Sequence, residues 1–172
     1  EDLRVSVLGA GALGIAALKA LKKLDYQVNC WSRTAKQLDG IHNYVGLEGL
    51  SSMLGKTDIL INLLPLTPDT YHLLDESLLA KLPKGVKLIN FSRGAVIDTK
   101  ALLGLLDLGH IAHAILDVFE QEPLAPSDAI WSNSNIAVLP HVSAPTNRYS
   151  SAKVIAENIK NYDENNIMPK FV

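Results

Sequence analysis

The chain has 172 residues, of which 48% are hydrophobic and 20% are charged, as in an ordinary soluble globular protein. Its formal charge of -2 argues against nucleic acid or an anionic membrane as the main partner. The single cysteine, Cys30, cannot form an internal disulfide, and we predict that it is buried in a strand. Because no apolar stretch reaches the roughly 18 residues of a membrane span, we expect a cytoplasmic protein.

Short apolar runs alternate with helical patterns along the whole chain. The predicted strands cover residues 5–8, 28–31, 58–63, 86–91, 114–118 and 136–139. The predicted helices cover residues 13–24, 47–54, 77–82 and 99–108, with a last one near 147–162. Asp98 or Thr99 is a candidate cap for the fourth helix, and Gly109 follows its end as a stop signal.

This alternation predicts an α/β fold with a parallel sheet and right-handed crossovers. We expect a single, Rossmann-like, doubly wound domain over residues 1–172, with strand order 3-2-1-4-5-6 and an added edge strand. The first strand begins almost at once, at Arg4, which suggests a piece of a longer chain.

A glycine pattern, G-x-G-x-x-G, joins the first predicted strand to the first helix. Gly9 permits a tight turn, Gly11 lets a pyrophosphate approach the backbone, and Gly14 lets the helix pack close to the sheet. Amide hydrogens at the start of the helix then face the anion. The pattern favours a dinucleotide site, and the alternative is a tight turn that happens to repeat glycine.

The second predicted strand lacks the acid that usually follows it in such a site. Ser32, Arg33 and Thr34 stand there instead, and their hydroxyls and guanidinium suit the 2′-phosphate of NADPH better than the ribose hydroxyl of NADH. The alternative is a solvated surface arginine. We therefore expect NADPH as the preferred cofactor, with NAD still possible.

Polar residues follow three later strands, at the edge where ligands bind in open α/β sheets. Arg93 could hold and polarise a keto acid, His141 could exchange a proton, and Glu122 could orient the imidazole. Taken singly, Arg93 could be half of an ion pair, Glu122 a solvated loop charge, and His141 a packed imidazole. Asp117, at the end of the fifth predicted strand, could be a helix cap or a surface acid.

With these motifs in order, the sequence resembles the nucleotide-binding domain of the D-isomer-specific 2-hydroxyacid dehydrogenases. The matching stretches are Gly9-Ala10-Gly11-Ala12-Leu13-Gly14, Asn90-Phe91-Ser92-Arg93-Gly94, Leu116-Asp117-Val118-Phe119, Glu122-Pro123-Leu124 and Pro140-His141. Within that family, residues 30–34 and 61–70 look most like the glyoxylate/hydroxypyruvate reductases, which use NADPH.

The resemblance implies catalytic roles for Arg93, Glu122 and His141. It places Asp117 at the nicotinamide carboxamide, Leu64 and Pro65 beside the adenosine, Thr70 near the phosphates, and the backbones of Phe91 and Ala144 near the nicotinamide. The full set of implied cofactor contacts is Gly9, Gly11, Ala12, Leu13, Gly14, Ser32, Arg33, Thr34, Leu64, Pro65, Thr70, Phe91, Ser92, Asp117 and Ala144.

The function implied is NADPH-dependent reduction of a small 2-keto acid, such as glyoxylate or hydroxypyruvate, to the D-2-hydroxy acid. The resemblance also implies a homodimer, and a separate substrate-binding domain that is absent from this chain. No metal site is expected, because the other histidines lack partners at metal-ligand spacing. The competing interpretation is a non-enzymatic NAD(P)-binding sensor or corepressor-like module, and an unrelated Rossmann oxidoreductase or hydrolase is a third.

Overall fold

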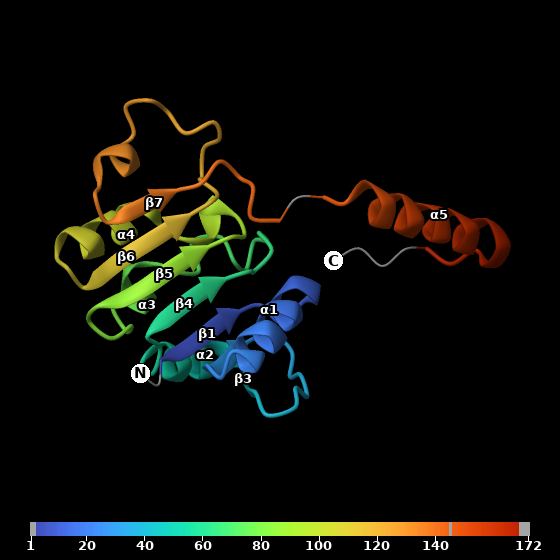
Figure 1. The fold of residues 1–172 in the computed structure, drawn as a ribbon, viewed down its shortest axis with the longest axis horizontal. Coiled ribbons are helices and arrows are strands. Elements are labelled where there is room, and N and C mark those ends of the chain that lie inside the picture. Colours follow the sequence, from blue (N-terminus) through green and yellow to red (C-terminus); the bar gives the residue numbers. More distant parts are fainter. Residues whose placement is uncertain (1–2, 145, 169–172) are drawn as a thin grey trace.

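The computed structural model describes residues 3–144 and 146–168, and its centre is a seven-stranded parallel sheet (Figure 1). The strands are β1 (Arg4–Leu8), β2 (Gln27–Trp31), β3 (His42–Tyr44), β4 (Ile59–Asn62), β5 (Val86–Asn90), β6 (Ile111–Leu116) and β7 (Ile136–Val138). The helices are α1 (Ala12–Lys23), α2 (Gly46–Leu54), α3 (Glu76–Leu79), α4 (Thr99–Asp107) and α5 (Arg148–Asn165). Short 3-10 turns cover Gly94–Val96 and Ala129–Ser132.

The sheet has the order β3-β2-β1-β4-β5-β6-β7, so the predicted 3-2-1-4-5-6 arrangement with an added edge strand is confirmed. The six predicted runs correspond to β1, β2, β4, β5, β6 and β7. β3 was not predicted, because its three residues, His-Asn-Tyr, carry no apolar pattern. β3 forms by pairing with β2, which places Asn43 opposite Cys30.

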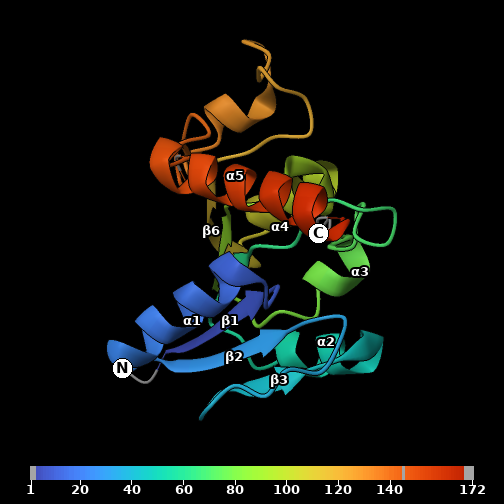
Figure 2. The same ribbon diagram turned by 90° about the vertical axis from the view of Figure 1, so that its right-hand side faces the viewer.

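Two apolar clusters fill the two faces of the sheet. Val5, Val7 and Leu18 belong to the cluster beneath α1, whereas Leu8 faces the larger cluster formed with α2, α3 and α4. Figure 2 shows α1 on one side of the sheet and α2 and α3 on the other. This alternation of faces along β1 is what a strand buried on both sides requires.

Cys30 lies fully buried in β2, as predicted, in the cluster beneath α1. Burial raises the pKa of its thiol, and the hydrogen bond from the Asn43 side chain offsets only part of that effect. A thiol in this state reacts slowly, so Cys30 is a packing residue.

The start of β1 is joined to the start of β4 by the ion pair between Arg4 and Asp58. The Asp58 carboxylate accepts the Arg4 backbone N–H at 2.9 Å, Nε at 2.8 Å and Nη2 at 2.7 Å. The Arg4 hydrogen bonds lower the pKa of Asp58 to about 2, against the opposing effect of burial. The pair therefore ties two adjacent parallel strands together at the edge opposite the glycine loop.

We expect Asp58→Asn to lower the free energy of unfolding by about 1 kcal/mol at neutral pH, because the pair is partly exposed and screened by water. The Asp58 pKa is lower in the folded chain than in the unfolded chain, where it is roughly 3.9. The ionised carboxylate therefore stabilises the fold fully at pH values above the unfolded pKa. That contribution disappears as the pH falls through about 2. Urea unfolding across pH measures it, with Glu157→Gln, in the exposed Lys153 pair, as the control. Equal losses in the two variants would contradict this account of Asp58.

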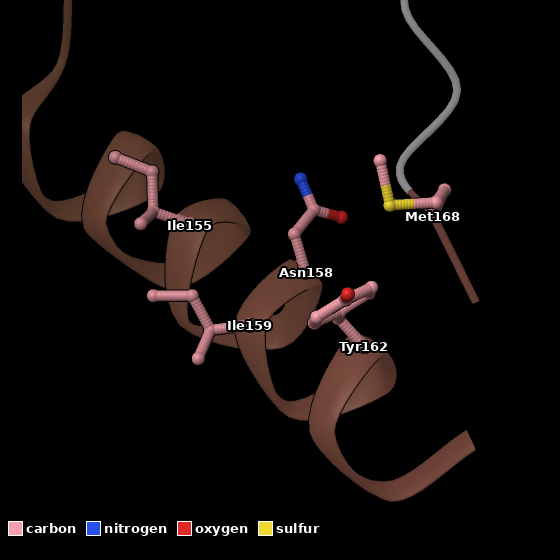
Figure 3. Close-up of a pocket in the computed structure, with 5 residues that line it drawn as sticks. All are labelled: Ile155, Asn158, Ile159, Tyr162 and Met168. Carbon is pink, nitrogen blue, oxygen red and sulfur yellow. The ribbon is translucent and has the colours of Figure 1, made fainter. Parts of the chain in front are cut away.

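α5 begins after the N-cap Asn147, whose side chain accepts the Tyr149 and Ser150 amides, and it buries none of its residues. It projects past the carboxyl ends of the strands, away from the sheet (Figure 1). Its apolar side chains and Met168 of the returning segment line a shallow hollow (Figure 3), formed by Ile155, Asn158, Ile159, Tyr162 and Met168. Among the described residues, no helix combines the length and apolar character that a membrane crossing requires.

Candidate active site at the carboxyl ends of the strands

All of the strand pairings are parallel, so the loops that follow the strands gather along one edge of the sheet. Two buried asparagines organise the centre of this edge. Asn62 ends β4 and Asn90 ends β5, and Asn62 Nδ2 donates to Asn90 Oδ1 at 3.0 Å. The same two amides bind the Leu64 N–H, the Ser92 N–H and the Arg93 carbonyl, and so fix both following loops.

The glycine loop has the shape that a pyrophosphate site requires. Gly9 has a φ of +100°, and a Cβ there would lie 2.8 Å from the Leu63 carbonyl oxygen. A Cβ on Gly14 would lie 1.9 Å from the Gly9 carbonyl oxygen, so only glycine lets α1 start this close to β1. Gly11 faces open space and caps α1 without a side-chain hydrogen bond.

The first turn of α1, which includes Ala12 and the exposed Leu13, contains no acidic residue. Its leading backbone N–H groups therefore combine with the positive end of the helix dipole and an open approach over Gly11. These residues fit the diphosphate of a dinucleotide.

The loop after β2 differs in detail from the predicted phosphate pocket. Arg33 and Thr34 are exposed, but Ser32 is buried, and its hydroxyl donates to the Thr34 carbonyl at 2.8 Å. Asn43 of β3 completes the loop by donating to the Ser32 hydroxyl oxygen at 2.9 Å and accepting the Lys36 N–H at 2.6 Å. Ser32 thus shapes the loop, while the Arg33 guanidinium and the Thr34 hydroxyl face solvent.

In the loop after β4, the polar side chain of Thr70 also forms hydrogen bonds within the loop. Thr70 is buried, and its hydroxyl donates to the Pro65 carbonyl at 2.6 Å and accepts the Thr67 N–H at 2.8 Å. Leu64 is buried, and its carbonyl accepts the hydroxyl of Ser92 from the neighbouring loop. Pro65 itself is exposed. Thr70 therefore fixes the turn around Pro65 and does not present its hydroxyl outward.

Phe91 follows β5, half-buried, and its N–H donates to the Asn62 carbonyl at 3.2 Å. The same loop presents Arg93 as an exposed cation. Arg93 Nη1 donates to the Ser92 carbonyl at 2.7 Å, which leaves the remaining guanidinium N–H groups for another partner.

Asp117 is completely buried at the end of β6, and both of its oxygens hold the loop that follows β7. It accepts the Val142 N–H at 2.8 Å, the Ser143 N–H at 2.9 Å and the Ser143 hydroxyl at 2.5 Å. Burial acts to raise the pKa of Asp117, but these hydrogen bonds hold it below its ordinary value. Asp117 thereby positions the segment from His141 to the exposed Ala144.

His141 and Glu122 form the pair that the sequence analysis predicted. His141 Nδ1 lies 2.9 Å from Glu122 Oε2, while Glu122 Oε1 accepts the Phe119 N–H at 2.9 Å. The Phe119 N–H lowers the pKa of Glu122, opposed by burial and assisted by His141 and by the positive charge of Arg93. The imidazole is half-exposed, and with Glu122 on Nδ1 no hydrogen bond to Nε2 is found within the described part of the chain.

The structure therefore brings Arg93, Glu122 and His141 to one edge, together with the glycine loop. The supporting residues Asn43, Asn62 and Ser143 were not predicted from the sequence. A signal for one of them existed, because β4 and β5 both end in Leu-Ile-Asn, which places an amide at the same level of neighbouring strands.

We expect Asn90→Ala to lower the free energy of unfolding by about 1–3 kcal/mol, because it leaves buried partners, among them the Asn62 amide, without a hydrogen bond. Urea unfolding of the chain measures the loss. Asn161→Ala, at an exposed site on α5, is the matched control and is expected to change stability by less than about 0.5 kcal/mol. Two variants of equal stability would show that the amide pair does not stabilise this edge.

Comparison with known proteins places this geometry in a family. Residues 1–143 match the family model described as D-isomer specific 2-hydroxyacid dehydrogenase, NAD binding domain. A D-isomer specific 2-hydroxyacid dehydrogenase from Xanthobacter autotrophicus Py2, solved with NADPH and MES, is 42% identical. Its TM-score is 0.93, and the match covers 98% of this chain and 69% of that one.

Two further solved structures agree. The NADPH-dependent glyoxylate/hydroxypyruvate reductase from Sinorhizobium meliloti, in complex with NADP and sulfate, is 35% identical, with TM-score 0.90 and coverage of 98% and 54%. A family protein from Klebsiella pneumoniae 342 is 38% identical, with TM-score 0.89 and coverage of 98% and 53%. The chain thus spans between 53% and 69% of these three structures. It belongs to the D-isomer specific 2-hydroxyacid dehydrogenases and corresponds to their NAD binding domain.

Proposed function

We propose that the whole protein containing this chain reduces a small 2-keto acid of the glyoxylate or hydroxypyruvate type to the D-2-hydroxy acid, using NADPH. The observation that carries the proposal is the His141–Glu122 pair at 2.9 Å, set at the same sheet edge as the glycine loop and Arg93. The relative from Sinorhizobium meliloti, at 35% identity, supports the substrate class.

The roles of the three polar residues follow from their hydrogen bonds. Glu122 holds Nδ1 of His141 and stabilises the imidazolium, so that Nε2–H can protonate the carbonyl oxygen of the substrate. Arg93 binds the keto acid and stabilises the negative charge that develops on that oxygen. NADPH, when bound, supplies the hydride that the carbonyl carbon accepts.

The remaining loop residues are proposed to bind the cofactor. The first turn of α1 receives the diphosphate, while Arg33 and Thr34 bind the 2′-phosphate. Leu64 and Pro65 flank the adenosine, and Phe91 and Ala144 border the nicotinamide. Asp117, which is completely buried beneath the loop of Val142 and Ser143, supports the nicotinamide side of the site by holding that loop in place.

We also propose that a separate substrate-binding lobe completes the whole protein. The coverage of 53% to 69% of the solved relatives supports it. So does α5, whose apolar side chains at Val154, Ile155 and Ile159 are more than half exposed. A lobe that packs against α5 would cover this apolar surface. The homodimer stays a prediction that light scattering on the whole protein tests.

The competing function is a non-enzymatic sensor that binds NAD(P) and then a partner. The two functions are separated by following NADPH absorbance with the whole protein and glyoxylate, hydroxypyruvate or pyruvate. We expect glyoxylate or hydroxypyruvate to give the fastest oxidation of NADPH. Tight NADPH binding without oxidation, for every keto acid, would contradict the enzyme and favour the sensor.

A further inference from the structure

Glu120 lies two residues before Glu122 but takes no part in the pair with His141. Its Oε1 accepts the Tyr71 hydroxyl at 3.2 Å and lies 3.1 Å from His72 Nε2, so it reaches across to the loop that follows β4. A carboxylate only accepts hydrogen bonds, so His72 Nε2 carries the hydrogen. The two rings stack with centroids 4.1 Å apart and an interplanar angle of 17°.

The Tyr71–His72 end of this bridge is itself anchored. His72 has a φ of +46°, a conformation that costs free energy for a residue other than glycine and needs support from its surroundings. That support comes from the loop after Arg93: the His72 N–H donates to the Ala95 carbonyl at 2.8 Å, and the Leu74 N–H donates to the Val96 carbonyl at 3.1 Å.

A direct backbone contact also joins the loop of Arg93 to the loop of Glu122. A Cβ on Gly94 would lie 1.9 Å from the Phe119 carbonyl carbon and 2.2 Å from the Glu120 nitrogen, so these two backbones touch. The carbonyl group of Phe119 thus lies against Gly94, while its N–H donates to Glu122 Oε1. The Glu120 side chain therefore braces a backbone segment that holds the catalytic carboxylate on one side and contacts the Arg93 loop on the other.

We propose that Glu120 is a positioning residue, which braces the loop of Glu122 against Tyr71 and His72 so that Glu122 keeps the imidazole of His141 directed at the substrate. This inference rests on the proposed reductase function for its kinetic consequence. It assigns to Glu120 no contact with the substrate. If Glu120 were only a solvated surface carboxylate, its replacement would leave the Glu122–His141 pair unaffected.

The test compares Glu120→Ala with Glu120→Gln in the whole protein. Both variants remove the charge, but the glutamine oxygen still accepts the Tyr71 and His72 hydrogens. We expect Glu120→Ala to lower kcat about tenfold, because small displacements of reacting groups cost this much or more, while KM for NADPH changes less than about twofold. Glu120→Gln is expected to retain most of kcat. Glu157→Ala, on exposed α5, is the matched control.

A spectroscopic readout keeps the test independent of turnover. The Nδ1 proton of His141, bonded to Glu122, is expected to give a low-field proton resonance that is retained in Glu120→Gln and weakened in Glu120→Ala. If Glu120→Ala fails to fold, His72→Asn removes the imidazole contact, tolerates a positive φ, and is expected to weaken the same resonance.

The outcomes separate the two ideas. A wild-type protein that oxidises no NADPH with any keto acid would overturn the reductase function, and the resonance would still decide the role of Glu120. An active wild type with an unchanged Glu120→Ala variant, in both kcat and resonance, would overturn the positioning role alone. So would a glutamine variant that falls as far as the alanine variant, since charge rather than orientation would then be the cause.

Discussion

His141→Ala in the whole protein is expected to lower kcat for keto-acid reduction by about 100- to 10,000-fold, the usual contribution of a positioned acid or base. The Kd for NADPH is expected to stay within about twofold, because His141 contacts Glu122 and is not part of the glycine loop. Stopped-flow turnover and a fluorescence titration with NADPH measure the two effects separately.

His113→Thr is the control for this variant, since it removes an exposed imidazole from β6 while keeping good strand propensity. It is expected to leave kcat unchanged. A His141→Ala protein that turns over as fast as the wild type would remove His141 from the mechanism.

Glu122→Gln extends the prediction to pH. The lowered pKa of Glu122 keeps this carboxylate charged at neutral pH, and its support for a protonated His141 is lost only as the pH falls through that lowered value. We therefore expect the wild-type kcat to decline on the acid side only as the pH falls through that lowered value. Glu122→Gln carries no charge at any pH, and it is expected to have a lower kcat without this acid-side decline, as measured by a rate profile against pH.

Arg33→Asp is expected to reverse the cofactor preference. A charge-assisted hydrogen bond is worth about 1.5–3 kcal/mol, so its loss weakens NADPH binding by about 10- to 100-fold, and the new carboxylate repels the 2′-phosphate further. NADH gains a partner for its ribose hydroxyls in the same change. Isothermal titration of both cofactors against the whole protein measures the ratio.

Lys84→Asp is the matched charge reversal, because Lys84 is exposed just before β5, at the opposite edge of the sheet. It is expected to change the two affinities equally and slightly, through net charge alone. An Arg33→Asp protein with the wild-type ratio of NADPH to NADH affinity would show that the Arg33 guanidinium does not bind the 2′-phosphate.

Periodicity and turn chemistry predicted most of the fold. Six of the strands, the glycine loop and the cap at Asp98, which accepts the Ala101 N–H, follow from apolar patterns and local backbone rules. β3 was not predicted, because it forms by pairing with β2. The sequence of its three residues does not indicate this non-local interaction.

The approach of Glu122 to His141 was predictable from the sequence, but the directions of several other polar side chains were not. Glu122 and His141 meet as expected, whereas Ser32 and Thr70 turn their hydroxyls onto nearby carbonyls. The carboxylate oxygens of Asp117 accept hydrogen bonds from the backbone N–H groups of Val142 and Ser143. Buried polar groups must be satisfied, and which partner satisfies them is decided by the packed loops, which a sequence pattern does not encode.

The stereochemistry of the product distinguishes the proposed D-specific reductase from other keto-acid reductases. The whole protein is incubated with hydroxypyruvate and NADPH, and the hydroxy acid is separated on a chiral column and counted against the NADPH consumed. We expect the D-enantiomer alone, with one molecule formed for each NADPH oxidised. The L-enantiomer, or loss of NADPH without a hydroxy acid, would contradict it.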